Sequence, residues 1–279
     1  MKGDTAMKTS IRLLASIACI SLIFVSGCKK SVKVPDSPDK VILQGLAALK
    51  ANKPGEAYAL LPKSYQKDVQ DLVAHATSKI DKEVFDLGMQ ILDKARSSLD
   101  KHGDAIAKMG MPNVKENLKG VKDVYDLING AKLLDHGSLS KLNVASFLGK
   151  QGPKLMEFGR SLAKKNKAKE YDKFEGMLAK ASAKVDKKEG DKATLTLTMG
   201  EKSKNLKMVK VEGTWVPEEM AKEWKEAIAD AKKNIDRSVD RMMKQKDRTK
   251  KMLQGVLAMI TEFEKSGDVS KLKGLMRAM

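Results

Sequence analysis

The 279-residue chain has little of several residue types on which protein chemistry often depends. It holds two cysteines, three histidines and 4% aromatic residues. Two cysteines are too few for a zinc site built from thiolates or for a disulfide framework. Scarce aromatic residues argue against a platform on which bases or sugars stack.

Recognisable catalytic motifs are also missing. His75, His102 and His136 stand far apart in the sequence, with no carboxylate at metal-ligand spacing. We interpret them as isolated surface histidines. No Gly-x-Ser-x-Gly, His-Glu-x-x-His or phosphate-cradling glycine loop occurs. Adjacent carboxylates, such as Asp81 and Glu83, stand at predicted helix starts, where the helix dipole favours them. We therefore expect no catalytic residue, no metal, no cofactor and no enzymatic activity.

The N-terminal segment has the pattern of an export signal. Lys8 and Arg12 precede an apolar run over residues 13–24, and Val25-Ser26-Gly27-Cys28 follows it. A positive start, a short apolar run and small residues before a cleavage point are typical of a secretory signal peptide. The run is too short to cross a bilayer as a helix.

The sequence Val25-Ser26-Gly27-Cys28 resembles the lipobox of bacterial lipoproteins, in which an aliphatic residue and two small residues precede a cysteine. The resemblance implies cleavage before Cys28, transfer of a diacylglycerol to its thiol, and attachment to the lipid bilayer through acyl chains. Residues 1–27 are then the signal peptide and residues 28–37 a lipidated tether. Cys19 is removed with the signal, so the mature chain keeps one acylated cysteine and no disulfide. Resemblance to enteric lipoproteins makes Lys29, which is not aspartate, a signal for the outer membrane facing the periplasm.

Positive charge is in excess, with 54 lysines and arginines against 36 acidic residues and a net charge of +18. Nucleic acid is the usual partner for such a balance, but export argues against it. Anionic lipid and acidic envelope proteins remain as partners. The densest basic stretch, residues 232–251, holds nine lysines and arginines against three aspartates. It either contacts an anionic surface or forms the solvated back of a helix. The candidate contact residues are Lys232, Lys233, Arg237, Arg241 and Lys244.

Hydrophobic periodicity predicts helices over most of the chain. Ser37 before Pro38 predicts a helix start with a hydroxyl cap. Residues 144–164 have helical spacing, and the polar stretch 245–251 predicts a break or an exposed turn. We interpret six methionines of the second half as adaptable core filling, with a methionine-lined ligand groove as the alternative. These are Met208, Met220, Met242, Met243, Met252 and Met259.

The period changes once, to that of a sheet. Residues 193–199 alternate apolar side chains with threonines, which is typical of a half-buried strand. With shorter segments on either side they predict an antiparallel meander of three or four strands within residues 183–217, with Trp215 in its core. The expected fold is α+β and mainly α: a helical N-terminal part, the meander and long C-terminal helices. We expect one domain over residues 38–265 and a C-terminal helical tail over residues 266–279.

Two segments carry a second resemblance. Pro54-Gly55-Glu56-Ala57-Tyr58-Ala59-Leu60-Leu61-Pro62-Lys63-Ser64-Tyr65 and Met208-Val209-Lys210-Val211-Glu212-Gly213-Thr214-Trp215-Val216-Pro217 look like segments of uncharacterised exported lipoproteins. They resemble, more distantly, cone-shaped α+β domains related to nuclear transport factor. We therefore expect an envelope lipoprotein that binds or scaffolds without catalysis. The alternative is a protein that binds a small ligand in a cavity of the cone.

Overall fold

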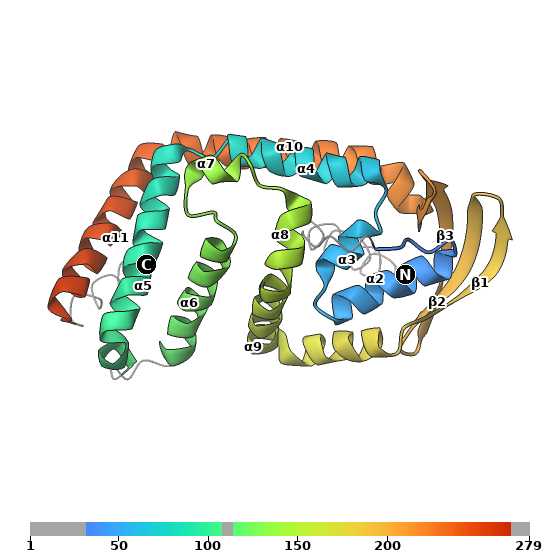
Figure 1. The fold of residues 1–279 in the computed structure, drawn as a ribbon, viewed down its shortest axis with the longest axis horizontal. Coiled ribbons are helices and arrows are strands. Elements are labelled where there is room, and N and C mark those ends of the chain that lie inside the picture. The colour runs from blue at the N-terminus through green and yellow to red at the C-terminus, as the bar shows by residue number, and fades with distance from the viewer. Residues whose placement is uncertain (1–31, 108–113, 269–279) are drawn as a thin grey trace, which may run out of the picture. The chain divides into compact units, whose positions relative to one another are not determined.

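The computed structural model describes residues 32–107 and 114–268, drawn as ribbons in Figure 1. The chain divides into two compact units, residues 1–73 with 142–230 and residues 74–141 with 231–279. Of the three boundaries, two fall inside helices, at residues 73 and 230, and one falls between helices, at residue 141. The prediction of one domain over residues 38–265 did not anticipate this division. Most of the predicted tail, residues 266–279, lies outside the described residues.

The first unit is helical on both sides of a single sheet. Proline stands in the first turn of three of its helices, where the missing N–H costs nothing. The elements are α2 (Pro38–Lys50), α3 (Pro54–Ala59), the first part of α4 (Lys63–Ser78), α8 (Val144–Lys150), α9 (Gly152–Ala179), the sheet and the first part of α10 (Glu218–Lys244).

One local prediction in this unit is wrong in detail. The hydroxyl of Ser37 does not cap the backbone of α2; it donates to the carboxylate of Asp39, a charged and therefore stronger acceptor. Residues 144–164 are helical as predicted, apart from Gln151. The chain breaks at Gln151, between α8 and α9, because Pro153 has no N–H with which to continue the helical ladder.

The predicted meander is confirmed. Strands β1 (Ser182–Glu189), β2 (Lys192–Met199), β3 (Lys202–Val211) and β4 (Thr214–Pro217) form one antiparallel sheet in sequential order. Gly190 and Gly200 take positive φ in the first two turns. In the third turn Glu212 and Gly213 both do, which matches a type I′ hairpin. With the helices around it, this sheet makes the fold α+β and mainly α, as the sequence predicts.

Helix α2 lies against the inner face of the sheet (Figure 1). Val41 of α2 packs in one cluster with Leu195, Met208 and Trp215, and Leu195 and Trp215 are almost fully buried. The indole N–H of Trp215 donates to the backbone carbonyl of Asp36, 3.1 Å away. The core position predicted for Trp215 is thereby confirmed, and side chains fill the space between α2 and the sheet.

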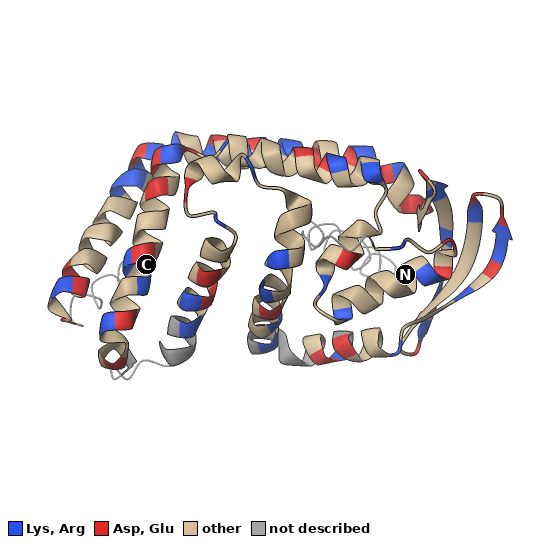
Figure 2. Cartoon of the chain, in the orientation of Figure 1, with Lys and Arg blue, Asp and Glu red and all other residues tan. Residues whose placement is uncertain are grey.

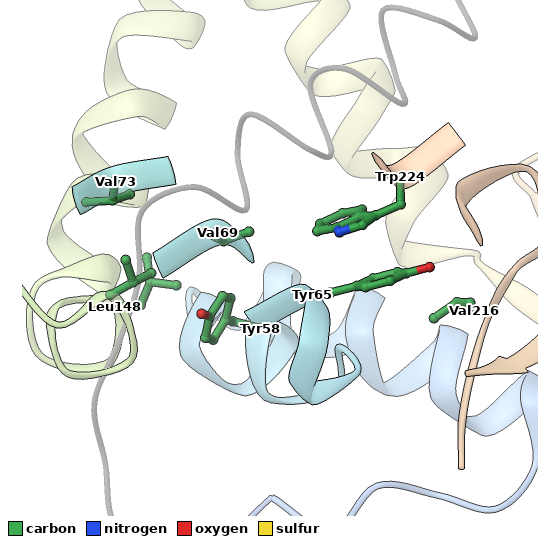
Figure 3. Close-up of a cluster of buried hydrophobic side chains, with 8 residues drawn as sticks. Tyr58, Tyr65, Val69, Val73, Leu148, Val216 and Trp224 are labelled. Carbon is green, nitrogen blue, oxygen red and sulfur yellow. The ribbon is translucent and has the colours of Figure 1, made fainter. Parts of the chain in front are cut away.

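A second cluster joins α3, α4, α8, β4 and the start of α10 (Figure 3). The rings of Tyr65 and Trp224 stack with centroids 4.1 Å apart and planes 7° from parallel. The indole N–H of Trp224 donates to the carboxylate of Asp68, 2.8 Å away, so the buried ring has no unpaired polar atom. Leu148 of α8 and Val216 of β4 lie at opposite ends of this cluster.

The second unit is entirely helical in its described residues. Helix α5 packs against both α6 and α11. The carboxylate of Asp81 accepts from the backbone N–H of Val84, so Asp81 caps α5, which confirms its interpretation as a helix-start charge. The described elements are the end of α4, α5 (Lys82–Ala107), α6 (Val114–Gly130), α7 (His136–Leu139), the end of α10 and α11 (Lys246–Ser266).

Candidate functional site on α10 and α11

Asp236 fixes the orientation of the end of α10 about the helix axis. Its carboxylate lies 2.8 Å from Nε2 of His75 and 3.3 Å from the ammonium of Lys79, both on α4. The hydrogen bond from His75 is the main reason why the pKa of Asp236 lies below its ordinary value. The face of α10 that lies away from these contacts is exposed to solvent. Arg241 and Lys244 stand in the last turn, where the helix dipole favours cations.

All five residues predicted to contact an anionic surface are exposed. At 3.6 residues per turn, Lys233, Arg237, Arg241 and Lys244 share one stripe of α10. Lys232 lies about 140° around the helix axis from Arg237 and faces another direction. The structure therefore brings four of the predicted residues together and leaves the fifth apart.

The stripe borders a shallow hollow of about 650 Å³, whose described lining comes from α10 alone. The guanidinium of Arg241 folds back along the helix, 3.4 Å from the carbonyl of Arg237 and from the hydroxyl of Ser238. Among the described residues, no carboxylate pairs with Arg237, Arg241 or Lys244. The lining residues are Asn234, Arg237, Ser238, Asp240, Arg241 and Lys244. The hollow is thus a polar, cationic and open surface.

The basic residues after α10 divide into two groups. Lys246 lies 2.8 Å from the carboxylate of Asp81, and Lys250 lies 3.1 Å from that of Glu83. These contacts hold the start of α11 against the start of α5. Arg248 and Lys251 are exposed on other faces of α11 and pair with no carboxylate in the described part of the chain. Figure 2 shows lysines and arginines gathered where α10 ends and α11 begins.

The break predicted within residues 245–251 is present but is confined to Gln245. Only Gln245 separates the two helices, and residues 246–251 are the first turns of α11. The stretch is polar because Lys246 and Lys250 serve ion pairs and the remaining side chains meet solvent.

The methionine prediction holds for some positions and fails for others. Met208 is buried in the sheet core and Met220 packs against the Tyr65–Trp224 cluster. Met242, Met243 and Met252 are 57%, 46% and 60% exposed, so they fill no core. Met242 continues the apolar stripe of α10, but little of the described chain covers it there.

The interpretation of the histidines as isolated surface residues is wrong. Each is half-buried and bonds to a segment at least 56 residues away in sequence. His75 bonds to Asp236, whereas Nε2 of His102 and of His136 each lie 2.9 Å from a backbone carbonyl. Within the described residues, no group of three or more His, Cys, Asp or Glu side chains is arranged to hold a metal ion.

Sequence reasoning missed the most strongly held carboxylate of the second unit. The side chain of Glu264 on α11 is 7% exposed and lies 2.8 Å from the ammonium of Lys94 and 2.7 Å from that of Lys101. The hydroxyl of Ser97 donates to it across 2.6 Å. Hydrogen bonds from Lys101, Lys94 and Ser97 lower its pKa to about 2. The three partners share one face of α5 at helical spacing, but nothing in the sequence pairs that face with Glu264.

The predicted signal peptide and Cys28 lie outside the described residues. No helix of residues 32–107 and 114–268 combines the length and the apolar character needed to cross a bilayer. Comparisons with protein-family models, curated proteins and solved structures found no significant match for this chain.

Proposed function

We propose that this chain is the precursor of a bacterial envelope lipoprotein, anchored in a membrane through acylated Cys28. The order of charges, apolar run and small residues before Cys28 carries the proposal. Acyl chains bury methylene groups in the bilayer at about 0.8 kcal/mol each, so several chains hold the protein there permanently. Lys29 supports placement in the outer membrane, facing the periplasm.

The folded part acts by binding or scaffolding rather than by catalysis. Two observations support a surface role: the packed side chains between α2 and the sheet, and the cationic stripe of Lys233, Arg237, Arg241 and Lys244. A cationic stripe open to solvent suits anionic lipid or an acidic envelope protein. The small-ligand alternative requires a cavity beneath the sheet, and the buried side chains of Leu195 and Trp215 occupy that position.

Anchoring is tested by growing cells with a labelled fatty acid. The wild-type chain should incorporate the label and Cys28→Ala should not. Cys19→Ala is the matched control, because it removes a cysteine that is cleaved away with the signal peptide, and it should be labelled like the wild type. Equal label in the wild type and Cys28→Ala would contradict the proposal.

Two further measurements address the membrane and the partner. On a density gradient the wild type should follow the outer membrane, whereas Lys29→Asp should move toward the inner membrane. Crosslinking in living cells followed by mass spectrometry should identify the partner. Arg237→Gln, Arg241→Gln and Lys244→Gln together should reduce this crosslink. The charge-matched control changes three exposed lysines of β3, Lys202, Lys204 and Lys207, to Gln and should not reduce it.

A further inference from the structure

The junction between α10 and α11 exposes an unusual amount of apolar surface. Among the described residues, four large hydrophobic side chains are prominently exposed, and three of them, Met242, Met243 and Met252, lie within this junction. We call residues 241–252 the α10–α11 corner. Three large exposed apolar side chains so close in sequence mark a contact surface more often than scattered single residues do.

Cations lie close to these methionines in the sequence. Arg241, Lys244, Arg248 and Lys251 are exposed, and none pairs with a carboxylate in the described part of the chain. The other two lysines of the corner, Lys246 and Lys250, are committed to Asp81 and Glu83 and hold the start of α11 in place. Around α11, Met252 lies about 40° from Arg248, and around α10 Met242 and Met243 lie about 100° from the nearer of Arg241 and Lys244. Exposed cations and unbranched apolar side chains thus occur together on a braced backbone.

We propose that the α10–α11 corner inserts its methionines into the headgroup region of an anionic bilayer. This inference rests on the proposed function, because the acyl anchor at Cys28 is what keeps the protein beside a bilayer. Lysine and arginine stems lie along apolar surface while their heads reach the phosphates, which is the arrangement that interfacial contacts use.

Charge complementarity favours a bilayer over a protein as the occupant. Lipid phosphates diffuse in the membrane plane and meet flexible cations wherever these point, so no preorganised partner geometry is needed. Protein interfaces are depleted in lysine, and four of the twelve residues of the corner are lysines. The anchor also raises the effective concentration of the bilayer, so a contact that is weak by itself becomes populated.

The test uses the full lipidated protein in vesicles and reads the corner directly. Acylated Cys28 leaves the mature chain without a free thiol, so Met243→Cys provides one site for an environment-sensitive fluorophore. With phosphatidylglycerol present, emission should shift to the blue and lipid-borne quenchers should reduce it. In neutral vesicles both effects should be at least severalfold smaller. Leu162→Cys is the matched control, since Leu162 on α9 is 44% exposed against 46% for Met243.

Charge variants separate the contribution of the cations. Replacing Arg241, Lys244, Arg248 and Lys251 with Gln should abolish the dependence on phosphatidylglycerol. Each well-placed cation near an anionic surface contributes on the order of fivefold in partitioning. The same change at four exposed lysines of the sheet, Lys192, Lys202, Lys204 and Lys207, should leave it in place. No shift at residue 243, or an equal shift at residue 162, overturns the proposal, as does a corner-dependent crosslink to an acidic protein without insertion.

The experiment distinguishes a chain that is not acylated at Cys28 from a chain whose α10–α11 corner does not bind the bilayer. If Cys28 is not acylated, the wild-type chain itself takes up the thiol-reactive dye, which contradicts the proposed function alone. The corner is then measured on residues 29–279 carrying Met243→Cys, a chain that keeps every described residue. Binding of this chain to anionic vesicles at low salt, weakened at high salt, supports the corner without the anchor. Absence of binding in both conditions contradicts it.

Discussion

Gly267 lies against the imidazole ring of His102. A Cβ added to Gly267 would stand 3.1 Å from both Cε1 and Nδ1 of that ring. Gly267 follows the end of α11 with φ of 66°, and its N–H donates to the carbonyl of Phe263, 2.8 Å away. The ring of His102 also meets that of Phe263 edge-on, with centroids 5.3 Å apart. The left-handed glycine thus ends α11 where α5 packs against it.

The first prediction is that Gly267→Ala destabilises the second unit. A side chain in the left-handed region costs about 1–2 kcal/mol, and displacement of His102 adds to it. Both tryptophans, Trp215 and Trp224, lie in the first unit, so their fluorescence does not report this change. Amide hydrogen exchange of α5 and α11 during urea titration measures it.

Gly255→Ala is the control with the opposite expected sign. Gly255 lies inside α11, and a Cβ built there meets nothing within 4 Å. Alanine in a helix interior is favoured over glycine by about 0.5–1 kcal/mol, so this variant should stabilise α11. Equal destabilisation by the two changes would contradict the role assigned to the left-handed cap.

The second prediction concerns acid stability. In the folded chain the pKa of Glu264 is about 2, against an ordinary value of 4.5. The carboxylate therefore contributes stability above pH 4.5, and this contribution is lost as the pH falls toward 2. Glu264→Gln should cost roughly 1–3 kcal/mol at neutral pH, because hydrogen bonds to a buried charged group are lost. The difference from wild type should shrink below pH 4.5.

Asp104→Asn is the matched control for this effect. Asp104 is an exposed carboxylate on α5, so its loss should change stability by only a few tenths of a kcal/mol at any pH. The comparison is made by urea unfolding of α5 and α11 across pH 2–7, read by hydrogen exchange. A deficit for Glu264→Gln that stays constant over this range would mean that Glu264 is not ionised in the fold.

The sheet could be predicted because the sequence features that specify it lie within or beside the strands themselves. Residues 193–199 alternate with period two, and Glu212-Gly213 marks a hairpin turn within a few residues of both partner strands. The core position of Trp215 was expected because the apolar face of the sheet needs a cover, which the helices supply. These features need no knowledge of distant segments, and all of them are confirmed.

The second unit was not predictable in the same way, because its contacts join distant segments. His75 meets Asp236 across 161 residues, and Lys94 meets Glu264 across 170. A lysine-rich stretch looks the same in a loop and on a helix surface. The ion pair between Lys246 at the start of α11 and Asp81 at the start of α5 is visible only in the fold. Exposure of Met242 and Met252 depends likewise on what lies across from them.

The last prediction concerns Gln70 on α4, whose amide holds the chain that enters α8. Its Nε2 donates to the carbonyl of Leu142, 2.9 Å away, and its Oε1 accepts from the N–H of Val144, 2.8 Å away. Two backbone groups of an irregular segment are thus paired by one side chain. Only a group that both donates and accepts can do this.

Gln70→Glu should destabilise the first unit by about 1–3 kcal/mol at pH 7, because a carboxylate oxygen would face the Leu142 carbonyl without a proton between them. A protonated carboxyl restores the donor, so folding should raise the pKa of the introduced group above its ordinary value of about 4.3. The stabilisation by the protonated carboxyl is then fully present below pH 4.3 and is lost as the pH rises through the raised pKa. The deficit relative to wild type should therefore decrease on acidification.

Gln70→Leu removes both hydrogen bonds and should give a deficit that does not change with pH. Urea unfolding followed by tryptophan fluorescence reads the Gln70 variants, since Trp215 and Trp224 both belong to the first unit. If Gln70→Glu and Gln70→Leu show the same deficit at every pH, the donor to Leu142 contributes nothing and the pairing assigned to Gln70 is wrong.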